Sequence, residues 1–230
     1  MAEDYSLVKN NTVSSAHQLK DTPVVRFYNP KGVGKRIMLV GNSITLHGVL
    51  PEIGWERECG MAASCVEKDY AHLLMQKTNA ICPDSVFCIC QVADWEREYH
   101  LGASLHAPYE NASHFNADII VLRLIENCPS NGFDPCLFKE NLAKLQAFLN
   151  PTNKAKVIVT TGFWRHPGDK ALIEYAVEND LPCVELGDVG DREEMRAIGE
   201  YWHEGVAAHP GDLGMANIAD RIFAELEKLL

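Results

Sequence analysis

Two residues of the chain, Ser43 and His209, have the types and positions needed for nucleophilic catalysis. Ser43 follows the apolar run 37–40 closely, and His209 lies just before the amphipathic C-terminal segment. A histidine, with an unperturbed pKa of about 6.5, can accept the proton of a serine hydroxyl and return it to a leaving group. Alone, such residues are more often structural, as an N-cap serine or an exposed histidine. Only their pairing favours catalysis.

Asn127 is a third candidate, because it follows the apolar run 118–124 at the carboxyl end of a predicted strand. Ligands and catalytic groups gather at this edge of open α/β sheets, so Asn127 would lie beside Ser43. Its side-chain N–H could stabilise a developing oxyanion, for which one donor is typically worth roughly 3 kcal/mol. A turn asparagine before Pro129 is the alternative interpretation.

Other kinds of site are disfavoured. The Gly-x-Ser-x-Gly pattern of the nucleophile elbow is absent, because Thr45 occupies its last position. The stretch 32–35, Gly-Val-Gly-Lys, precedes a strand and lacks the context of a phosphate-binding loop. The nine histidines and eight cysteines show no metal-ligand spacing, so we expect no metal and no organic cofactor.

The elements that position these residues alternate between short apolar runs and longer amphipathic stretches, which predicts βαβ units and a parallel sheet. The runs are rich in Val, Ile and Leu, as strands covered on both faces should be. Five strands are predicted, over residues 36–40, 85–90, 118–124, 156–161 and 182–186.

Helices are predicted between the strands from capping signals and helical spacing. They run from the capping box Ser64-Cys65-Val66-Glu67 to about Lys77, from Asp134 to Asn150, from Pro167 onward, and from the N-cap Asp212 to the C-terminus. The charged run 94–98 is interpreted as a solvated helix start without a chemical role.

Composition places the chain among ordinary globular proteins. Of 230 residues, 47% are hydrophobic and 23% charged, which excludes disordered, collagen-like and coiled-coil classes. The formal net charge of −11 disfavours nucleic acid as a partner. No apolar stretch is long enough to span a membrane and the polar start does not resemble a signal peptide, so a cytoplasmic protein is expected. The oligomeric state is left open.

We expect one domain over residues 31–230. Residues 1–30 are polar without clean periodicity, and an arm, an edge strand and a mobile tail are all compatible with that composition. No repeat, linker or low-complexity segment divides the rest of the chain.

Taken together, these residues make the chain resemble the SGNH hydrolases, also called the GDSL esterase and lipase family. The family's Gly-Asp-Ser block corresponds to 41–45, Gly-Asn-Ser-Ile-Thr, with Asn42 where aspartate is usual. Its second block, which supplies a backbone N–H, corresponds to 91–94, with Ala93 in place of the usual glycine. The added methyl group would narrow the space for the acyl group.

The last two blocks of the family are partly kept. Its Gly-x-Asn-Asp block corresponds to Ile125-Glu126-Asn127-Cys128, which keeps Asn127, and its Asp-x-x-His block ends at His209. Val206 occupies the position of the acid. An alignment with two inserted residues would make Glu204 the replacement. The competing interpretation is a Ser–His dyad whose histidine is oriented by a backbone carbonyl.

The resemblance implies a three-layer α/β/α fold with a five-stranded, flavodoxin-like parallel sheet. It implies that Ser43 attacks an ester carbonyl and that His209 transfers the proton. The N–H groups of Ser43 and Ala93, with the Asn127 amide, would form the oxyanion hole.

The expected function is that of a serine esterase for small, acetyl-like acyl groups, with a carbohydrate as one candidate alcohol. Asn42, His47, Trp55 and Trp164 are candidate substrate contacts, although a packing role for the tryptophans is equally compatible. A catalytically weak SGNH domain that binds a carbohydrate or protein is the first alternative. A lysophospholipase or thioesterase is the second.

Overall fold

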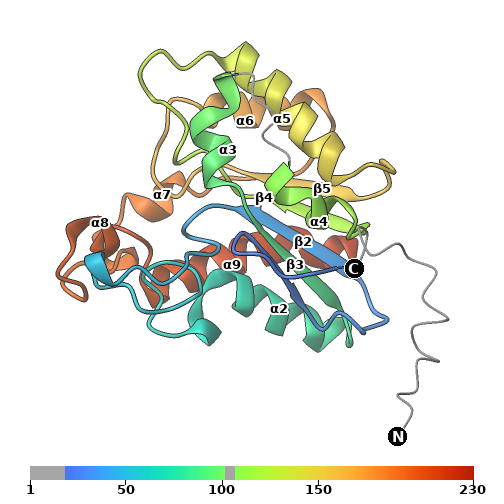
Figure 1. The fold of residues 1–230 in the computed structure, drawn as a ribbon. Coiled ribbons are helices and arrows are strands. Elements are labelled where there is room, and N and C mark those ends of the chain that lie inside the picture. Colours follow the sequence, from blue (N-terminus) through green and yellow to red (C-terminus); the bar gives the residue numbers. More distant parts are fainter. Residues whose placement is uncertain (1–18, 102–106) are drawn as a thin grey trace, which may run out of the picture.

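The protein folds into a three-layer α/β/α sandwich (Figure 1). Its structure is a computed structural model that describes residues 19–101 and 107–230. The expected α/β class is confirmed, but the sheet of the described residues has six strands rather than five, in the order β1-β3-β2-β4-β5-β6. They are β1 Val25–Tyr28, β2 Arg36–Gly41, β3 Val86–Gln91, β4 Ile119–Leu122, β5 Lys156–Thr160 and β6 Cys183–Val184.

The five predicted strands are present and parallel, and the additional strand β1 pairs antiparallel with β3. Three of the four β1 residues are only half-buried, as suits an edge strand, so β1 lacks the apolar run that marks the others. It belongs to the N-terminal segment 1–30, of which residues 1–18 lie outside the described residues.

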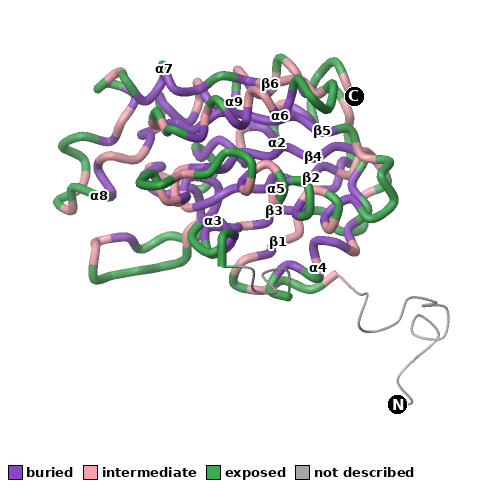
Figure 2. Tube along the Cα trace, turned by 90° about the horizontal axis from the view of Figure 1, so that it is seen from above, coloured by how far each residue is buried: buried purple, intermediate pink, exposed green. Residues whose placement is uncertain are grey.

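Two helical layers cover the sheet. The helices are α2 Tyr70–Ile81, α3 Ala93–Glu98, α4 Glu110–Ser113, α5 Pro135–Leu149, α6 Asp169–Glu178, α7 Gly187–Gly190, α8 Glu204–Ala207 and α9 Asp212–Leu226. Short 3₁₀ turns lie at Pro51–Ile53, Val66–Lys68, Tyr99–Leu101, Ala107–Tyr109, Glu193–Met195 and Glu227–Leu229. Figure 2 shows that the central strands are mostly buried.

Alternate residues of each central strand face opposite layers, because side chains in a strand point to its two faces in turn. On β2, Ile37 and Leu39 belong to the apolar cluster that includes α2 and α9. Met38 and Val40 belong to the cluster that includes α5 and α6. Both faces of β2 are therefore buried, and its carboxyl end is held rigidly.

Two predicted helix caps are wrong, although α9 begins at Asp212 as predicted. The cap of α2 is Asp69, whose side chain accepts the His72 N–H at 2.7 Å, rather than Ser64. Ser64 instead binds Asp212 through both its N–H and its hydroxyl, at 2.8 and 2.7 Å. Asp212 also pairs with Lys68, so its carboxylate joins two segments and does not cap α9. By contrast, the predicted cap of α5 at Asp134 is confirmed.

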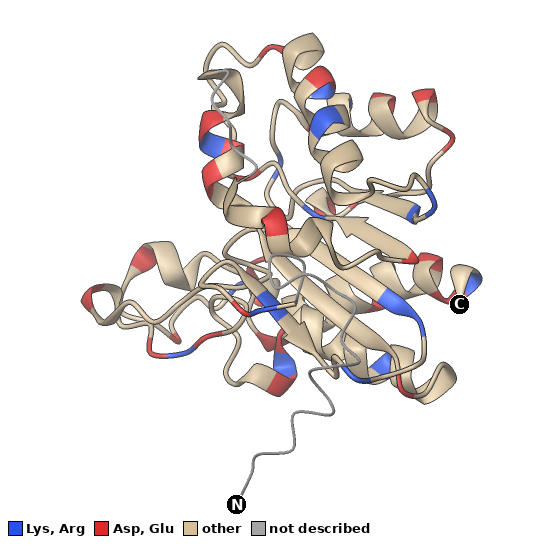
Figure 3. Ribbon diagram, turned by 45° about the vertical axis from the view of Figure 1, so that its right-hand side comes forward, with Lys and Arg blue, Asp and Glu red and all other residues tan. Residues whose placement is uncertain are grey.

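Charged residues lie mainly on helices and loops and hardly at all on the central strands (Figure 3). Among the described residues, no helix is both long enough and apolar enough to cross a membrane.

Candidate active site

Ser43 stands in a tight turn at the carboxyl end of β2. A Cβ at Gly41 would overlap the Thr45 hydroxyl oxygen and lie 2.8 Å from the Arg123 carbonyl oxygen, so only glycine fits there. The Thr45 N–H donates to the Asn42 carbonyl at 2.9 Å and closes the turn. Ser43 is half-buried between buried neighbours, so its hydroxyl is held at the surface of a packed edge.

The structure brings Ser43 and His209 into hydrogen-bond contact. Ser43 Oγ lies 2.9 Å from His209 Nε2, although the two residues are 166 positions apart. His209 Nδ1 lies 2.7 Å from the Gly205 carbonyl oxygen, which can only accept a hydrogen bond. Nδ1 therefore carries the ring proton, and Nε2 presents its lone pair to the serine hydroxyl. This tautomer is the one that a general base requires.

The His209 ring is also fixed by packing. Trp164 meets it edge to face, with ring centroids 5.0 Å apart, and the Trp164 indole N–H donates to the Ala208 carbonyl at 3.2 Å. Burial lowers the pKa of His209 to about 4, although the Gly205 carbonyl acts in the opposite direction. The ring is therefore neutral, and able to accept a proton, at neutral pH.

The position of a triad acid is filled by a backbone carbonyl. Gly205 lies in α8, one turn before His209, and its oxygen takes the place that a carboxylate would occupy. Glu204 is exposed, so the structure does not support the expectation that its carboxylate orients His209. Val206, at the position of the family's acid, is fully buried among apolar residues.

Three groups were expected to stabilise an oxyanion, and they differ in the hydrogen bonds that they already make. The Ser43 N–H has no hydrogen-bond partner among the described residues. The Ala93 N–H, in the first turn of α3, donates to the Gln91 side chain at 3.2 Å. Asn127 gives one side-chain N–H to Glu96 at 2.5 Å and keeps a second.

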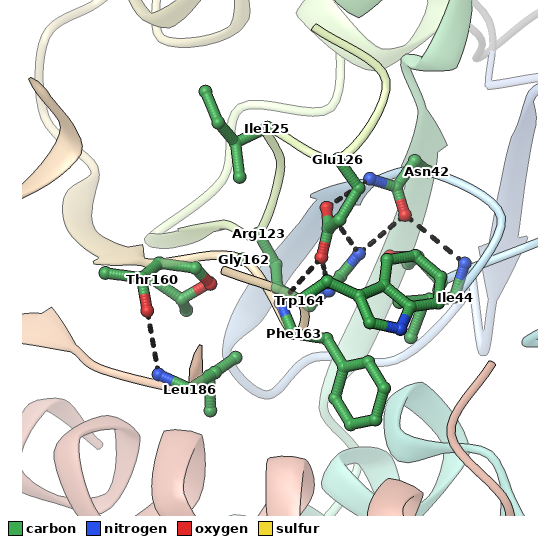
Figure 4. A network of polar contacts seen from close by, with 12 residues as sticks. Asn42, Ile44, Arg123, Ile125, Glu126, Thr160, Gly162, Phe163, Trp164 and Leu186 are labelled. Carbon is green, nitrogen blue, oxygen red and sulfur yellow. Dashed lines mark hydrogen bonds and ion pairs between the residues drawn. The ribbon is translucent and has the colours of Figure 1, made fainter. Parts of the chain in front are cut away.

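A buried polar network beneath Ser43 joins the ends of β2, β4 and β5 (Figure 4). Asn42 accepts from Arg123 at 2.5 Å through Oδ1 and donates to Glu126 at 2.6 Å through Nδ2. Arg123 and Glu126 form a buried ion pair with an N–O distance of 2.7 Å. Glu126 also accepts the Phe163 N–H at 2.8 Å. Asn42, the residue before Ser43, is thereby anchored to the segment that follows β4.

Glu96 of α3 completes this network and is fully buried. It accepts from Asn127, from Asn42 Nδ2 at 3.0 Å, and from the Ile125 backbone N–H. For Glu96, the interpretation of 94–98 as a solvated helix start is therefore wrong. Glu96 lies in a run with three other charged residues, and its burial depends on partners that follow β2 and β4, which local sequence does not reveal.

The two buried carboxylates have opposite pKa shifts. Burial and then the charge of Glu126 raise the pKa of Glu96 to about 7. For Glu126, burial acts to raise the pKa, but Arg123 and the N–H donors outweigh it, so its pKa lies below the usual value. The pair thus consists of a carboxylate held ionised by Arg123 and a second one that gains a proton near neutral pH.

Ile125 has an unusual backbone conformation, with φ at 125°. A β-branched residue rarely adopts this region, and the family's block has glycine at the corresponding position. The buried isoleucine thus keeps a conformation that glycine normally provides. In this conformation its N–H donates to Glu96, and the next two residues, Glu126 and Asn127, enter the polar network.

Four residues were expected to contact substrate. Asn42 and Trp55 are fully buried, which does not support that role. His47 is half-buried, and its Nδ1 lies 2.6 Å from the Gly48 carbonyl oxygen. Trp164 is half-buried and packs against the catalytic candidate His209. Among the described residues, no cluster of His, Cys, Asp or Glu could hold a metal ion.

Trp202, which the sequence did not single out, is 72% exposed. Its indole lies against Gly54, where a Cβ would come within 2.5 Å of the indole nitrogen. Trp202 precedes α8, which carries Gly205, and Gly54 lies in the loop that follows Ser43. The exposed ring therefore lies between the loop that follows Ser43 and the segment that leads to His209.

Comparison with solved structures identifies the fold. A lipase/acylhydrolase from Enterococcus faecalis has a TM-score of 0.55 at 16% identity, covering 84% of this chain and 96% of that one. A two-domain esterase active on acetylated mannans has a TM-score of 0.53 at 17% identity, covering 87% of this chain. This chain spans about half, 51%, of that esterase. An acetyl xylan esterase has a TM-score of 0.51 at 18% identity, covering 83% of this chain and 98% of that one.

No protein-family model and no curated protein matches the sequence. The structural likeness nevertheless defines the class: the chain has the fold of the SGNH hydrolases. At these identities the likeness shows the fold alone.

Proposed function

We propose that the protein is a carboxylic ester hydrolase of the SGNH type, with Ser43 as nucleophile and His209 as general base. The observation that carries this proposal is the 2.9 Å contact between Ser43 Oγ and His209 Nε2, with the Nδ1 proton held by Gly205. In this arrangement Nε2 can accept the proton of the Ser43 hydroxyl, which is the role of a general base.

In the proposed reaction, Ser43 Oγ attacks the ester carbonyl while its proton passes to His209 Nε2. The Ser43 N–H and the second N–H of Asn127 stabilise the oxyanion, and the Ala93 N–H joins them when Gln91 releases it. The C–O bond to the alcohol then breaks, and His209 gives its proton to the leaving oxygen. Water, deprotonated by His209, hydrolyses the acyl-enzyme and restores Ser43.

We propose small acyl groups on a carbohydrate as the substrate class. The similar structures include esterases described as active on acetylated mannans and on acetyl xylan. In this chain, the exposed ring of Trp202 offers the kind of aromatic surface that stacks on a sugar. Trp202→Ala should raise KM for an acetylated oligosaccharide several-fold and leave that for p-nitrophenyl acetate unchanged. An equal effect on both substrates would contradict this assignment.

The activity itself is tested by hydrolysis of p-nitrophenyl acetate, with thermal melts to verify folding. Folded Ser43→Ala and His209→Ala variants should each lose at least about a thousandfold in kcat, as removal of triad members does. A series of acyl lengths from acetate to palmitate then separates a small-acyl esterase from a lysophospholipase or thioesterase. Equal rates in wild type and both variants would refute the esterase assignment and favour a binding module.

A further inference from the structure

Two consecutive residues of α3 hold the Asn127 side chain from opposite sides. Glu96 Oε2 accepts from Asn127 Nδ2 at 2.5 Å, and Arg97 Nη2 donates to Asn127 Oδ1 at 3.3 Å. A carboxylate can only accept and a guanidinium can only donate, so together they specify which end of the amide is the nitrogen. The amide is thereby set with its donor end toward Glu96, and one N–H remains for another acceptor.

Glu96 itself has N–H donors but no cationic partner in the described part of the chain. Asn42, Asn127 and the Ile125 backbone all donate to it. The buried guanidinium of Arg123 pairs with Glu126 instead. With both carboxylates ionised, the cluster formed by Glu96, Glu126 and Arg123 carries one uncompensated negative charge. Such a charge is costly in a buried site.

We propose that Glu96 is the positioning residue of the oxyanion site, and that hydrolysis proceeds when Glu96 is protonated and stops when it ionises. This inference rests on the proposed esterase function. It gives a role to Glu96, which contacts neither Ser43 nor His209.

The physical reason is the charge that develops on the substrate oxygen. An amide that already donates to an anion is a poorer donor to a second anion, and two negative charges in one buried site repel each other. A protonated Glu96 still accepts from Asn127 through its carbonyl oxygen, so the amide keeps its orientation while the repulsion disappears.

The neighbouring charges support ionisation near neutral pH. Burial and Glu126 raise the pKa of Glu96, while its N–H donors lower it, with a result of about 7. The titratable groups that interact with Glu96 are Arg123, Glu126 and Cys128, from the segment that follows β4, and Tyr109, from the 3₁₀ turn Ala107–Tyr109. Arg97, on the same helix as Glu96, binds Asn127. Of these, Glu126 is the partner whose charge most opposes ionisation of Glu96.

The test is the pH dependence of kcat/KM for p-nitrophenyl acetate, measured for wild type and Glu96→Gln from pH 4 to 9. The Ser43→Ala variant supplies the background rate. Wild type should lose about tenfold or more above neutral pH, because each pH unit beyond a controlling pKa lowers the active fraction about tenfold. The Glu96→Gln variant, which keeps one acceptor oxygen and has no charge, should show no such alkaline limb.

The matched control is Glu98→Gln, which removes a carboxylate from the exposed face of the same helix. It should keep the alkaline limb of wild type. An alkaline limb that persists in Glu96→Gln, or disappears in Glu98→Gln, would overturn the inference.

A second measurement needs neither activity nor a variant. The side-chain ¹⁵N–H₂ resonances of Asn127 in the full-length protein should shift with an apparent pKa near 7, because Asn127 donates directly to Glu96. Resonances that stay constant from pH 5 to 9 would refute the inference even if the esterase is active. Conversely, a titrating Asn127 in a protein without esterase activity would refute the proposed function and leave the Glu96–Asn127 coupling standing.

Discussion

At the scale of single residues, the site differs from a complete triad in one group. A backbone carbonyl at Gly205 fixes the tautomer of His209, which is the orienting half of an acid's role. A carbonyl dipole stabilises an imidazolium less than a carboxylate does. The site therefore has the geometry of a triad, with weaker electrostatic stabilisation of a protonated His209. The carboxylate of Glu126, in the buried network, acts on His209 through its charge and raises the pKa of the ring.

Glu204→Gln tests this view of the third position. Because the carboxylate is exposed and His209 Nδ1 is bound to Gly205, the variant should keep kcat/KM within about twofold of wild type, as surface substitutions usually do. The measurement is steady-state hydrolysis of p-nitrophenyl acetate, with His209→Ala as the inactive reference. A hundredfold loss would show that Glu204 reaches His209 during the reaction.

Asn42→Asp is a second prediction at this scale, and it concerns the residue where the family usually has aspartate. Glu96 and Glu126 both accept from Asn42 Nδ2, so a carboxylate there would place three negative groups around Arg123. We expect the free energy of unfolding to fall by about 3 kcal/mol, the scale for an uncompensated buried charge. Urea unfolding at pH 8 measures it.

The double variant Asn42→Asp with Glu96→Gln provides the control, since it restores the original number of carboxylates. It should recover part of the lost stability, as coupled neighbours do. Equal stability of wild type and Asn42→Asp would contradict the assigned network.

At the scale of elements, the parallel strands and most helices could be predicted because their signals are local. Strands β2 to β5 are continuous apolar runs, and the cap of α5 is an aspartate before a proline. The start of α2 could not be predicted, because Ser64 binds Asp212, 148 residues away, rather than its own helix. Edge strand β1 has no apolar run of its own.

In the candidate site, too, some residues have local sequence signals and others depend on distant parts of the chain. Ser43 and His209 could be predicted from their positions beside recognisable elements, and their contact is what a parallel sheet produces at its carboxyl edge. Glu96 could not. For His209, the sequence allows either Glu204 or a backbone carbonyl as the orienting group, and it does not indicate which carbonyl. The burial of Glu96 depends on partners that lie 29 and 54 residues away in the sequence. A backbone acceptor leaves no side-chain signature.

The turn after β2 gives a prediction at this scale. In Gly41→Ala, the new methyl group would collide with Thr45 and the Arg123 carbonyl, so the turn that holds Ser43 must shift. We expect a loss of stability of about 1–3 kcal/mol, as overpacking produces, together with a fall in kcat. Gly48→Ala in the following loop is the matched control, because a Cβ there meets nothing within 4 Å. Similar melting temperatures for the two variants would contradict the steric argument.

At the scale of the whole molecule, the sheet gathers distant residues into one buried network, and its ionisation affects global stability. The raised pKa of Glu96 means that the folded state binds a proton more tightly than the unfolded chain does. Its contribution to stability is therefore fully present below the ordinary pKa of glutamate and is lost as the pH rises through about 7.

Comparison of wild type with Glu96→Gln isolates this contribution from other titrating groups. The difference between their urea midpoints should change between pH 5 and 8, with wild type losing relative stability as the pH rises. The Glu98→Gln variant should follow wild type throughout. If the difference between the urea midpoints of wild type and Glu96→Gln is constant, Glu96 has the same charge at pH 5 and at pH 8.

The central claim is that His209 activates Ser43 as a nucleophile. Covalent labelling of the folded protein by a fluorophosphonate tests it most directly, with the modified residue located by mass spectrometry of its proteolytic peptides. We expect a single adduct on Ser43, formed rapidly in wild type and at least about a hundredfold more slowly in His209→Ala. Absence of an adduct on Ser43, or equal labelling rates in the two proteins, would contradict it.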